Sequence, residues 1–283
     1  MEISTIGVVG AGQMGRGIAQ IAIQSGHKVC MFDVSADSLE AGKAFITKQL
    51  NRGIEKGKWG QASVDSSLAL LTVVSDMKEL GSCDLIVEAA TENKKIKFEI
   101  FKQLDEVAKE GAILATNTSS ISITEIAANT KRPELVCGMH FMNPVPVMKL
   151  VEGIRGLETS DETFDTVAAC SEKMGKTFVK AKDIPGFAVN RILMPMINEA
   201  VYTLYEGIAS VEDIDTAMKL GTNQPMGPLT LADFIGLDTC LAIMEVLFEG
   251  LSDTKYRPCP LLKQYVAAGR LGKKSGRGFY KYN

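Results

Sequence analysis

The chain has 283 residues, long enough for two domains of ordinary size with separate cores. Its 46% apolar residues, 23% charged residues and net charge of −3 are typical of a globular protein, and they give no reason to expect nucleic acid or an acidic membrane as a partner. No apolar run reaches the length of a membrane span, and Met1 leads into a predicted strand without a basic and apolar leader, so we expect a cytoplasmic protein.

The N-terminal segment predicts a nucleotide-binding turn. An apolar run over residues 6–9 leads directly into Gly10-Ala11-Gly12-Gln13-Met14-Gly15, and a helix is predicted over 16–25. In a G-x-G-x-x-G turn the first glycine permits the tight turn, the second lets a pyrophosphate approach the backbone, and the third lets the helix pack against the strand. The N-terminus of the helix would then face the phosphates. The alternative is a glycine-rich turn in another kind of α/β protein.

The next apolar run, residues 29–32, ends at Asp33, where a carboxylate would bind the hydroxyls of a ribose. Asp33 would repel the 2′-phosphate of NADP and no arginine follows it, so the sequence favours NAD. NADP is not excluded, because a nearby lysine could compensate. Residues 35–67 are longer than a simple crossover needs and carry basic residues on a polar helical pattern, which is either a solvated face or a helical arm with a role in binding.

Further strands are predicted at 71–74, 85–88, 112–116, 136–140 and 148–151, with a last strand-like run at 178–180. This alternation predicts a Rossmann-type, mostly parallel sheet with helices on both faces, in a domain over residues 1–184. A break at Pro185-Gly186 starts a helical region over 185–283. Helices are predicted there over 188–205, over 211–220 behind Ser210 as an N-cap, and over 229–251. Their apolar residues face several sides, so we expect an all-α dimerisation domain and an isologous homodimer.

Two histidines are candidates for proton transfer. His27 is expected in a solvated turn. His140 ends an apolar strand at the carboxyl edge of the sheet, where α/β folds bind ligands, and an imidazole there suits proton exchange with a reacting oxygen. If the strands at 136–140 and 148–151 are neighbours, Glu152 can reach one ring nitrogen, fix the tautomer and favour the protonated form.

Other polar residues leave alternatives open. Ser119 follows a buried strand, but its loop could equally cap the helix predicted over 124–128. Asn190 opens the helical domain and is by default an exposed residue at a helix start. The six cysteines form no Cys-x-x-Cys pair and are expected to be reduced packing residues. Cys137 and His140 lack a second ligand pair, so no metal is expected.

Over nearly its whole length the chain resembles the short-chain L-3-hydroxyacyl-CoA dehydrogenase family, most closely its bacterial 3-hydroxybutyryl-CoA branch. The segments that carry the resemblance are GAGQMG (10–15), EAATEN (88–93), TNTSS (116–120), GMHFMNPVP (138–146), PGFAVNR (185–191), PMGP (225–228) and GKKSGRGFY (272–280). So many motifs in family order are specific evidence.

The resemblance implies a role for each matching residue. His140 becomes the general acid/base and Glu152 its partner, while Ser119 and Asn190 bind the substrate oxygens. The cofactor would be held by Gly10, Gly12, Gln13, Met14, Gly15, Asp33, Ala90, Glu92, Lys97, Asn117, Asn143 and Lys274. Lys48, Arg52 and Lys56 of the arm would bind CoA, although this part matches the family poorly.

The implied reaction is the reversible NAD-dependent interconversion of acetoacetyl-CoA and (S)-3-hydroxybutanoyl-CoA. Two alternatives remain. 3-Hydroxyisobutyrate and 6-phosphogluconate dehydrogenases share the glycine pattern but use a lysine at the head of a long helix, where this chain has Asn190 and no lysine before Lys219. A non-catalytic dinucleotide-binding or structural descendant of a dehydrogenase need not retain Ser119, His140, Glu152 and Asn190 together. Turnover of acetoacetyl-CoA with NADH separates these possibilities.

Overall fold

The computed structural model describes residues 2–282 and divides into two units at the bond between Ile184 and Pro185. Each unit has its own apolar core, one built on the sheet of the first unit and one among the helices of the second. None of the helices in the part of the chain described could cross a membrane. All six cysteines are free thiols and five of them are buried, as expected for packing residues.

The first unit is built on an eight-stranded sheet with the order β3-β2-β1-β4-β5-β6-β7-β8. Its strands are β1 Thr5–Val9, β2 Lys28–Phe32, β3 Leu71–Val74, β4 Leu85–Glu88, β5 Ile113–Thr116, β6 Val136–Phe141, β7 Leu150–Arg155 and β8 Thr177–Lys182. Neighbouring strands are parallel except β6 and β7. The strand order reverses between β1 and β4, so ligands are expected at the carboxyl ends of these strands.

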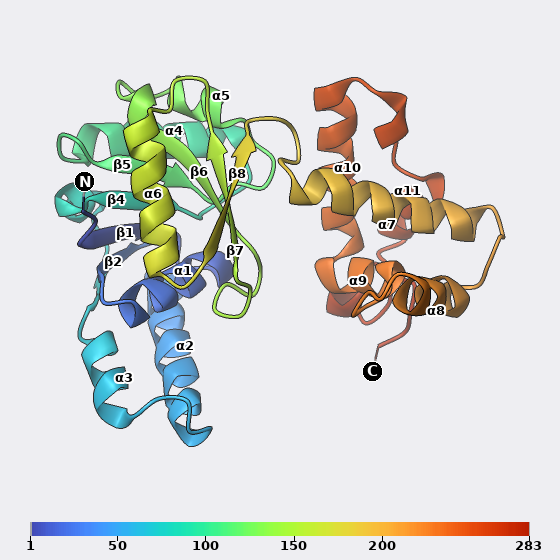
Figure 1. The fold of residues 1–283 in the computed structure, drawn as a ribbon, viewed down its shortest axis with the longest axis horizontal. Coiled ribbons are helices and arrows are strands. Elements are labelled where there is room, and N and C mark those ends of the chain that lie inside the picture. Colours follow the sequence, from blue (N-terminus) through green and yellow to red (C-terminus); the bar gives the residue numbers. More distant parts are fainter. Residues whose placement is uncertain (1, 283) are drawn as a thin grey trace. The chain divides into compact units, whose positions relative to one another are not determined.

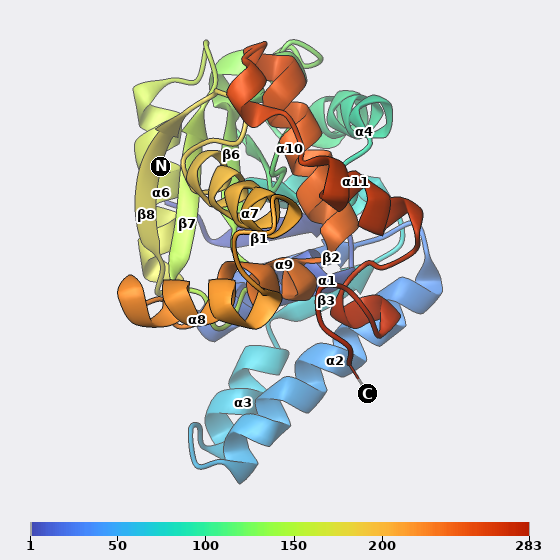
Figure 2. The same cartoon turned by 90° about the vertical axis from the view of Figure 1, so that its right-hand side faces the viewer.

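The helices of this unit are α1 Gln13–Gln24, α2 Ala36–Glu55, α3 Gln61–Leu68, α4 Lys94–Val107, α5 Ile123–Ala127 and α6 Asp161–Lys173. In Figure 1, α6 crosses in front of the strands and α4 lies behind them, so both faces of the sheet are covered. Helices α2 and α3 pack on each other and extend past the sheet in Figures 1 and 2. The predicted α/β fold with a helical arm is confirmed.

The second unit is all-α, with α7 Val189–Tyr205, α8 Val211–Gly221, α9 Pro228–Ile235, α10 Leu237–Leu251 and α11 Pro260–Ala267. Ser210 caps α8 as predicted, because its side chain accepts the N–H of Asp213. The helical region expected over 229–251 is present, but it divides into two helices, α9 and α10. Gly236 has a φ of +102°, which ends α9 and starts α10 in a new direction.

Two further expectations need correction. The strand expected at 148–151 runs over Leu150–Arg155, so Glu152 lies inside β7 and does not follow it. His27 is not solvated but only 1% exposed, and its Nδ1 lies 3.0 Å from the Ser25 hydroxyl. Burial, reinforced by the charge of Lys173, lowers the pKa of His27 below its usual value. Polarity alone could not show that this turn folds back on the core.

Candidate active site

The glycine-rich turn follows β1 and leads into α1. Gly10 has a φ of +100°, and a Cβ there would lie 2.7 Å from the carbonyl oxygen of Ala89. A Cβ at Gly15 would collide with the carbonyl of Gly10, whereas a Cβ at Gly12 would meet open space. No side chain caps α1 at Gly12, so the first N–H groups of the helix remain available to an anion. These features fit the pyrophosphate of a dinucleotide such as NAD.

Asp33 follows β2 beside this turn. Its carboxylate accepts the N–H of Ala11 at 2.8 Å and the N–H of Ser35 at 2.9 Å, so it fixes the turn as well as offering acceptors to a ribose. The contact with Ala11 was not predicted, since the two residues are far apart in sequence. Val34, the next residue, is 92% exposed and leaves room beside the carboxylate.

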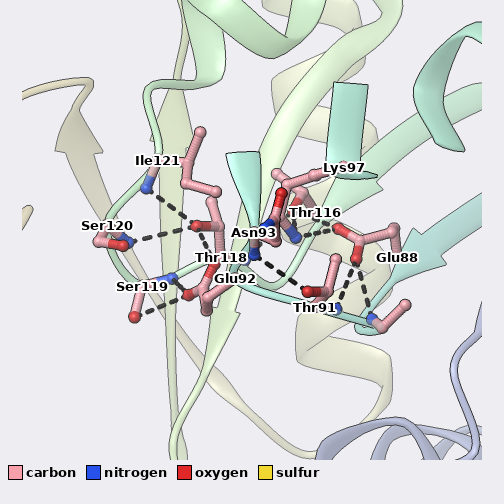
Figure 3. Close-up of polar contacts among 11 residues, drawn as sticks. Glu88, Thr91, Glu92, Asn93, Lys97, Thr116, Thr118, Ser119, Ser120 and Ile121 are labelled. Atoms are coloured by element: carbon pink, nitrogen blue, oxygen red, sulfur yellow. Dashed lines mark hydrogen bonds and ion pairs between the residues drawn. The ribbon is translucent and has the colours of Figure 1, made fainter. Parts of the chain in front are cut away.

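A buried ion pair underlies the ends of β4 and β5 (Figure 3). Lys97 in α4 is 1% exposed, and its ammonium group pairs with Glu88, which is fully buried. Thr116 donates to the Glu88 carboxylate at 2.8 Å and accepts from Lys97 at 3.2 Å. Glu88 also accepts the N–H of Ala90 at 2.8 Å, which ties the ion pair to the turn packed against Gly10.

From its buried position, Lys97 therefore holds, through Glu88, the turn that contains Ala90. Direct contact of Lys97 with the cofactor stays a prediction. Sequence reasoning missed Glu88 and Thr116. The available signal was a charged residue and a hydroxyl at the ends of two otherwise apolar strands.

Glu92 joins the predicted cofactor site to the predicted substrate site (Figure 3). One carboxylate oxygen accepts the N–H of Ser119 at 2.6 Å and its hydroxyl at 2.8 Å. The other oxygen accepts the hydroxyl of Thr118 at 2.8 Å. Ser122, and not Ser119, caps α5, so the capping alternative for Ser119 is wrong. Ser119 thus lies in a loop beside the ends of β4 and β5 and is hydrogen-bonded there to Glu92.

The imidazole–carboxylate pair lies on two adjacent strands. β6 and β7 are antiparallel and their register places His140 directly opposite Glu152. Nδ1 of His140 lies 2.8 Å from Oε2 of Glu152, which is fully buried, while His140 is 7% exposed. The predicted contact is confirmed. A buried carboxylate at this distance holds the ring in one orientation.

Hydrogen bonds of Asn117 and Gln13 connect β6, the strand of His140, and the loop after it to neighbouring parts of the site. Asn117, at the end of β5, accepts the N–H of Phe141 at 2.9 Å. Gln13, in the first turn of α1, donates to the side chain of Asn143 at 3.0 Å. These two contacts connect the glycine-rich turn and the end of β5 to the segment that carries the predicted acid/base, His140.

The remaining predicted residues lie elsewhere. Lys48 and Arg52 line a groove of about 740 Å³ along α2, together with Lys43, whereas Lys56 lies outside its lining. In the second unit, Asn190 is in the first turn of α7 and is only 7% exposed, so the default expectation of an exposed residue is wrong. Lys274 pairs with Asp238 at 2.6 Å. Their binding roles stay predictions.

The first unit thus has the fold and glycine turn of a dinucleotide-binding domain, with a histidine–carboxylate pair on its adjacent strands β6 and β7, as expected of a dehydrogenase. Comparison with known proteins agrees. Residues 5–184 match the model of the 3-hydroxyacyl-CoA dehydrogenase NAD-binding domain, and residues 186–282 match that of the C-terminal domain. The chain belongs to the 3-hydroxyacyl-CoA dehydrogenase family, and it is an oxidoreductase that uses NAD.

Relatives resemble the chain over its full length. It is 60% identical to a probable 3-hydroxybutyryl-CoA dehydrogenase of Bacillus subtilis, over 100% of this chain and 98% of the relative. It is 44% identical to the human mitochondrial hydroxyacyl-coenzyme A dehydrogenase, over 99% of this chain and 91% of the relative. The crystal structure of a Ralstonia eutropha (S)-3-hydroxybutyryl-CoA dehydrogenase superposes with a TM-score of 0.98 at 52% identity, with both chains fully covered.

The dyad makes a prediction about rate. Replacement Glu152→Gln keeps the size of the side chain but removes the carboxylate that orients the His140 ring, so proton transfer to the substrate oxygen would be less well aligned. We expect kcat for acetoacetyl-CoA reduction to fall at least about 10-fold. Steady-state rates measure this loss. Glu158→Gln, an exposed carboxylate in the loop after β7, is the matched control. Wild-type kcat in Glu152→Gln would refute the dyad.

Proposed function

We propose that the chain catalyses the reversible reduction of acetoacetyl-CoA to (S)-3-hydroxybutanoyl-CoA, with NADH as the reductant, in the cytoplasm. The observation that carries this proposal is the 2.8 Å contact between His140 and the buried Glu152, in a segment that a hydrogen bond connects to the glycine-rich turn. The 3-hydroxybutyryl-CoA dehydrogenases that match the full chain support the choice of substrate.

The glycine-rich turn and Asp33 would hold NADH, which would supply a hydride to C3 of the substrate. Because Nδ1 of His140 is engaged by Glu152, we assign Nε2 as the atom that gives its proton to the C3 oxygen as charge develops there. Glu152 compensates the imidazolium before transfer and keeps the ring in one orientation afterwards. In the oxidation direction Nε2 accepts the proton from the C3 hydroxyl.

Ser119 and Asn190 are proposed to donate hydrogen bonds to the C3 oxygen or the thioester carbonyl. Glu92 accepts both the N–H and the hydroxyl proton of Ser119 and so holds the loop in one place. A serine hydroxyl has one proton, so to donate to a substrate oxygen it would turn away from Glu92.

The direct test is turnover of acetoacetyl-CoA with NADH and, in parallel, with NADPH. 3-Hydroxyisobutyrate and 6-phosphogluconate with NAD are the competing substrates. We expect oxidation of NADH dependent on acetoacetyl-CoA, with little turnover of the other two compounds. NADH binding without turnover of any of these substrates would favour a non-catalytic dinucleotide-binding protein.

The arm is proposed to bind the nucleotide part of CoA through Lys48, Arg52 and Lys56. The groove along α2 supports the first two and adds Lys43. A Cβ at Gly53 would collide with the Trp59 ring, so the ring lies against the end of α2 and packs on the core. This placement makes Trp59 a structural part of the arm, and its emission remains a reporter of binding nearby.

Replacing Lys48, Arg52 and Lys56 together with glutamine is expected to raise the KM for acetoacetyl-CoA roughly 10-fold, since exposed ion pairs contribute up to about 1 kcal/mol each. The KM for acetoacetyl-pantetheine, which lacks the nucleotide, should change little and serves as the internal control. In wild type, added salt should weaken acetoacetyl-CoA binding followed by Trp59 emission. Equal effects on both thioesters, or none on either, would assign the CoA site elsewhere.

A homodimer through the second unit is also proposed. That unit exposes large apolar side chains, among them Ile192 at 73%, Ile208 at 68% and Leu220 at 80%. Burial of such side chains against a second copy of the chain would remove their apolar area from water. Sedimentation equilibrium at micromolar concentration should give twice the 30.5 kDa mass of the chain.

A further inference from the structure

Lys176 is a buried cation to which the proposed mechanism gives no task. It lies between α6 and β8 and is 8% exposed. Its ammonium group donates to the carbonyl oxygens of Val145 at 2.5 Å and Met148 at 2.8 Å. Burial lowers the pKa of Lys176, so its charged form is costly where it stands. A cation kept in such a place needs a reason, because an apolar side chain would avoid this cost.

Both acceptors belong to one loop. Residues 142–149 connect the end of β6 to the start of β7, and so join the strand of His140 to the strand of Glu152. The same loop contains Asn143, which accepts the hydrogen bond from Gln13 in the first turn of α1. The position of the loop therefore sets where Asn143 lies relative to the glycine-rich turn.

The loop has few anchors of its own. Val145 is buried and packs against α1, since a Cβ at Gly17 would come within 2.9 Å of its side chain. Val147 and Met148 are 71% and 42% exposed, and their N–H groups both turn back to the carbonyl of Pro144. With a single well-buried apolar side chain, the loop depends on hydrogen bonds to its carbonyls for a fixed conformation.

We propose that Lys176 is a positioning residue for catalysis: by holding the carbonyls of Val145 and Met148, it fixes the 142–149 loop and keeps Asn143 at the glycine-rich turn. Charge-assisted hydrogen bonds are stronger than neutral ones, which suits this task. The inference rests on the proposed reaction only for its kinetic readout. The placement of the loop can be measured without turnover.

The test replaces Lys176 with methionine, which has a similar length but no donor. Lys180→Met is the matched control, because Lys180 is an exposed lysine of β8 with a loose ion pair to Asp165 at 3.7 Å. Hydrogen exchange at the amides of Val147 and Met148 should become at least about 10-fold faster in Lys176→Met and stay unchanged in the control. Unchanged exchange would overturn the proposal, whatever substrate the enzyme uses.

A kinetic experiment compares Lys176→Met, Asn143→Ala and the double variant. It measures kcat and the KM for NADH well below the unfolding temperature. We expect kcat to fall at least about 10-fold in Lys176→Met, because small displacements in a site can cost up to about 100-fold. The double variant should fall little further than Asn143→Ala, since both changes act through one loop. Additive losses, or wild-type kcat in Lys176→Met, would mean that Lys176 does not act through Asn143.

Lys176→Arg keeps a cation with several donors and should recover most of the lost kcat. If Lys176→Met does not fold while Lys176→Arg is fully active, the ammonium group serves folding and the positioning role is wrong. If Lys176→Arg folds but has a lower kcat than wild type, adding it to Asn143→Ala should not lower kcat further. A further loss of kcat in that double variant would contradict the proposal.

Discussion

His140→Gln is expected to lower kcat for acetoacetyl-CoA reduction by at least about 100-fold, because general acid catalysis contributes roughly 10²- to 10⁴-fold. Glutamine retains a polar side chain of similar reach, but it cannot give a proton to the C3 oxygen. The equilibrium constant for NADH binding, followed by NADH fluorescence, should stay within about twofold of wild type. The glycine-rich turn and Asp33 do not depend on the imidazole for their hydrogen bonds.

His27→Gln provides the control, since it removes the other imidazole of the chain from the turn between α1 and β2. Its kcat per folded molecule should match wild type within about twofold. A His140→Gln enzyme that keeps more than about a tenth of wild-type turnover would contradict the assignment of His140 as the proton donor. Loss of NADH binding in His140→Gln would place the ring at the cofactor instead.

The double replacement Asp33→Ser, Val34→Arg is expected to raise the ratio of kcat/KM for NADPH to that for NADH roughly 10- to 100-fold. Serine removes the charge that repels a 2′-phosphate, and the exposed position of Val34 gives an arginine access to that phosphate. A hydrogen bond to a charged group contributes about 1.5–3 kcal/mol, which corresponds to this range. The loss of the bond between Asp33 and Ala11 should also weaken NADH binding.

Val34→Arg alone is the control, because it adds the cation but keeps the repelling carboxylate. Its ratio of kcat/KM for NADPH to that for NADH should change much less than the ratio of the double variant. Paired assays with NADH and NADPH at one acetoacetyl-CoA concentration measure both ratios. An unchanged ratio in the double variant would mean that Asp33 does not lie at the adenosine ribose.

The sequence was most informative where a structural feature depends on a few neighbouring residues. The glycine spacing from Gly10 to Gly15 predicted the turn between β1 and α1, and apolar runs gave β3 and β4 with their observed bounds. Ser210 was identified as an N-cap from its place before an apolar helical pattern. Periodicity and capping are local properties, and they are present in any short window of the chain.

Patterns of polarity failed where the backbone changes direction. Apolar residues continue through 229–251, so the sequence indicates a helical region without a break, while the positive φ of Gly236 divides it into α9 and α10. His27 was expected in water because it lies in the turn between the first helix and the second strand, but its side chain is buried. Neither the break at Gly236 nor the burial of His27 follows from composition, since both depend on the segments that pack against these residues.

The chain by itself determined which residues can transfer a proton, bind a pyrophosphate and accept from a ribose. Tertiary structure decided which of them meet. The contact between His140 and Glu152 exists because β7 turns antiparallel to β6 in a register that places the two opposite each other. The burial of Lys97 with Glu88, and of Lys176 under the 142–149 loop, likewise depends on segments far apart in sequence. Long-range register and burial are set by the packing of the whole first unit, and no local pattern contains them.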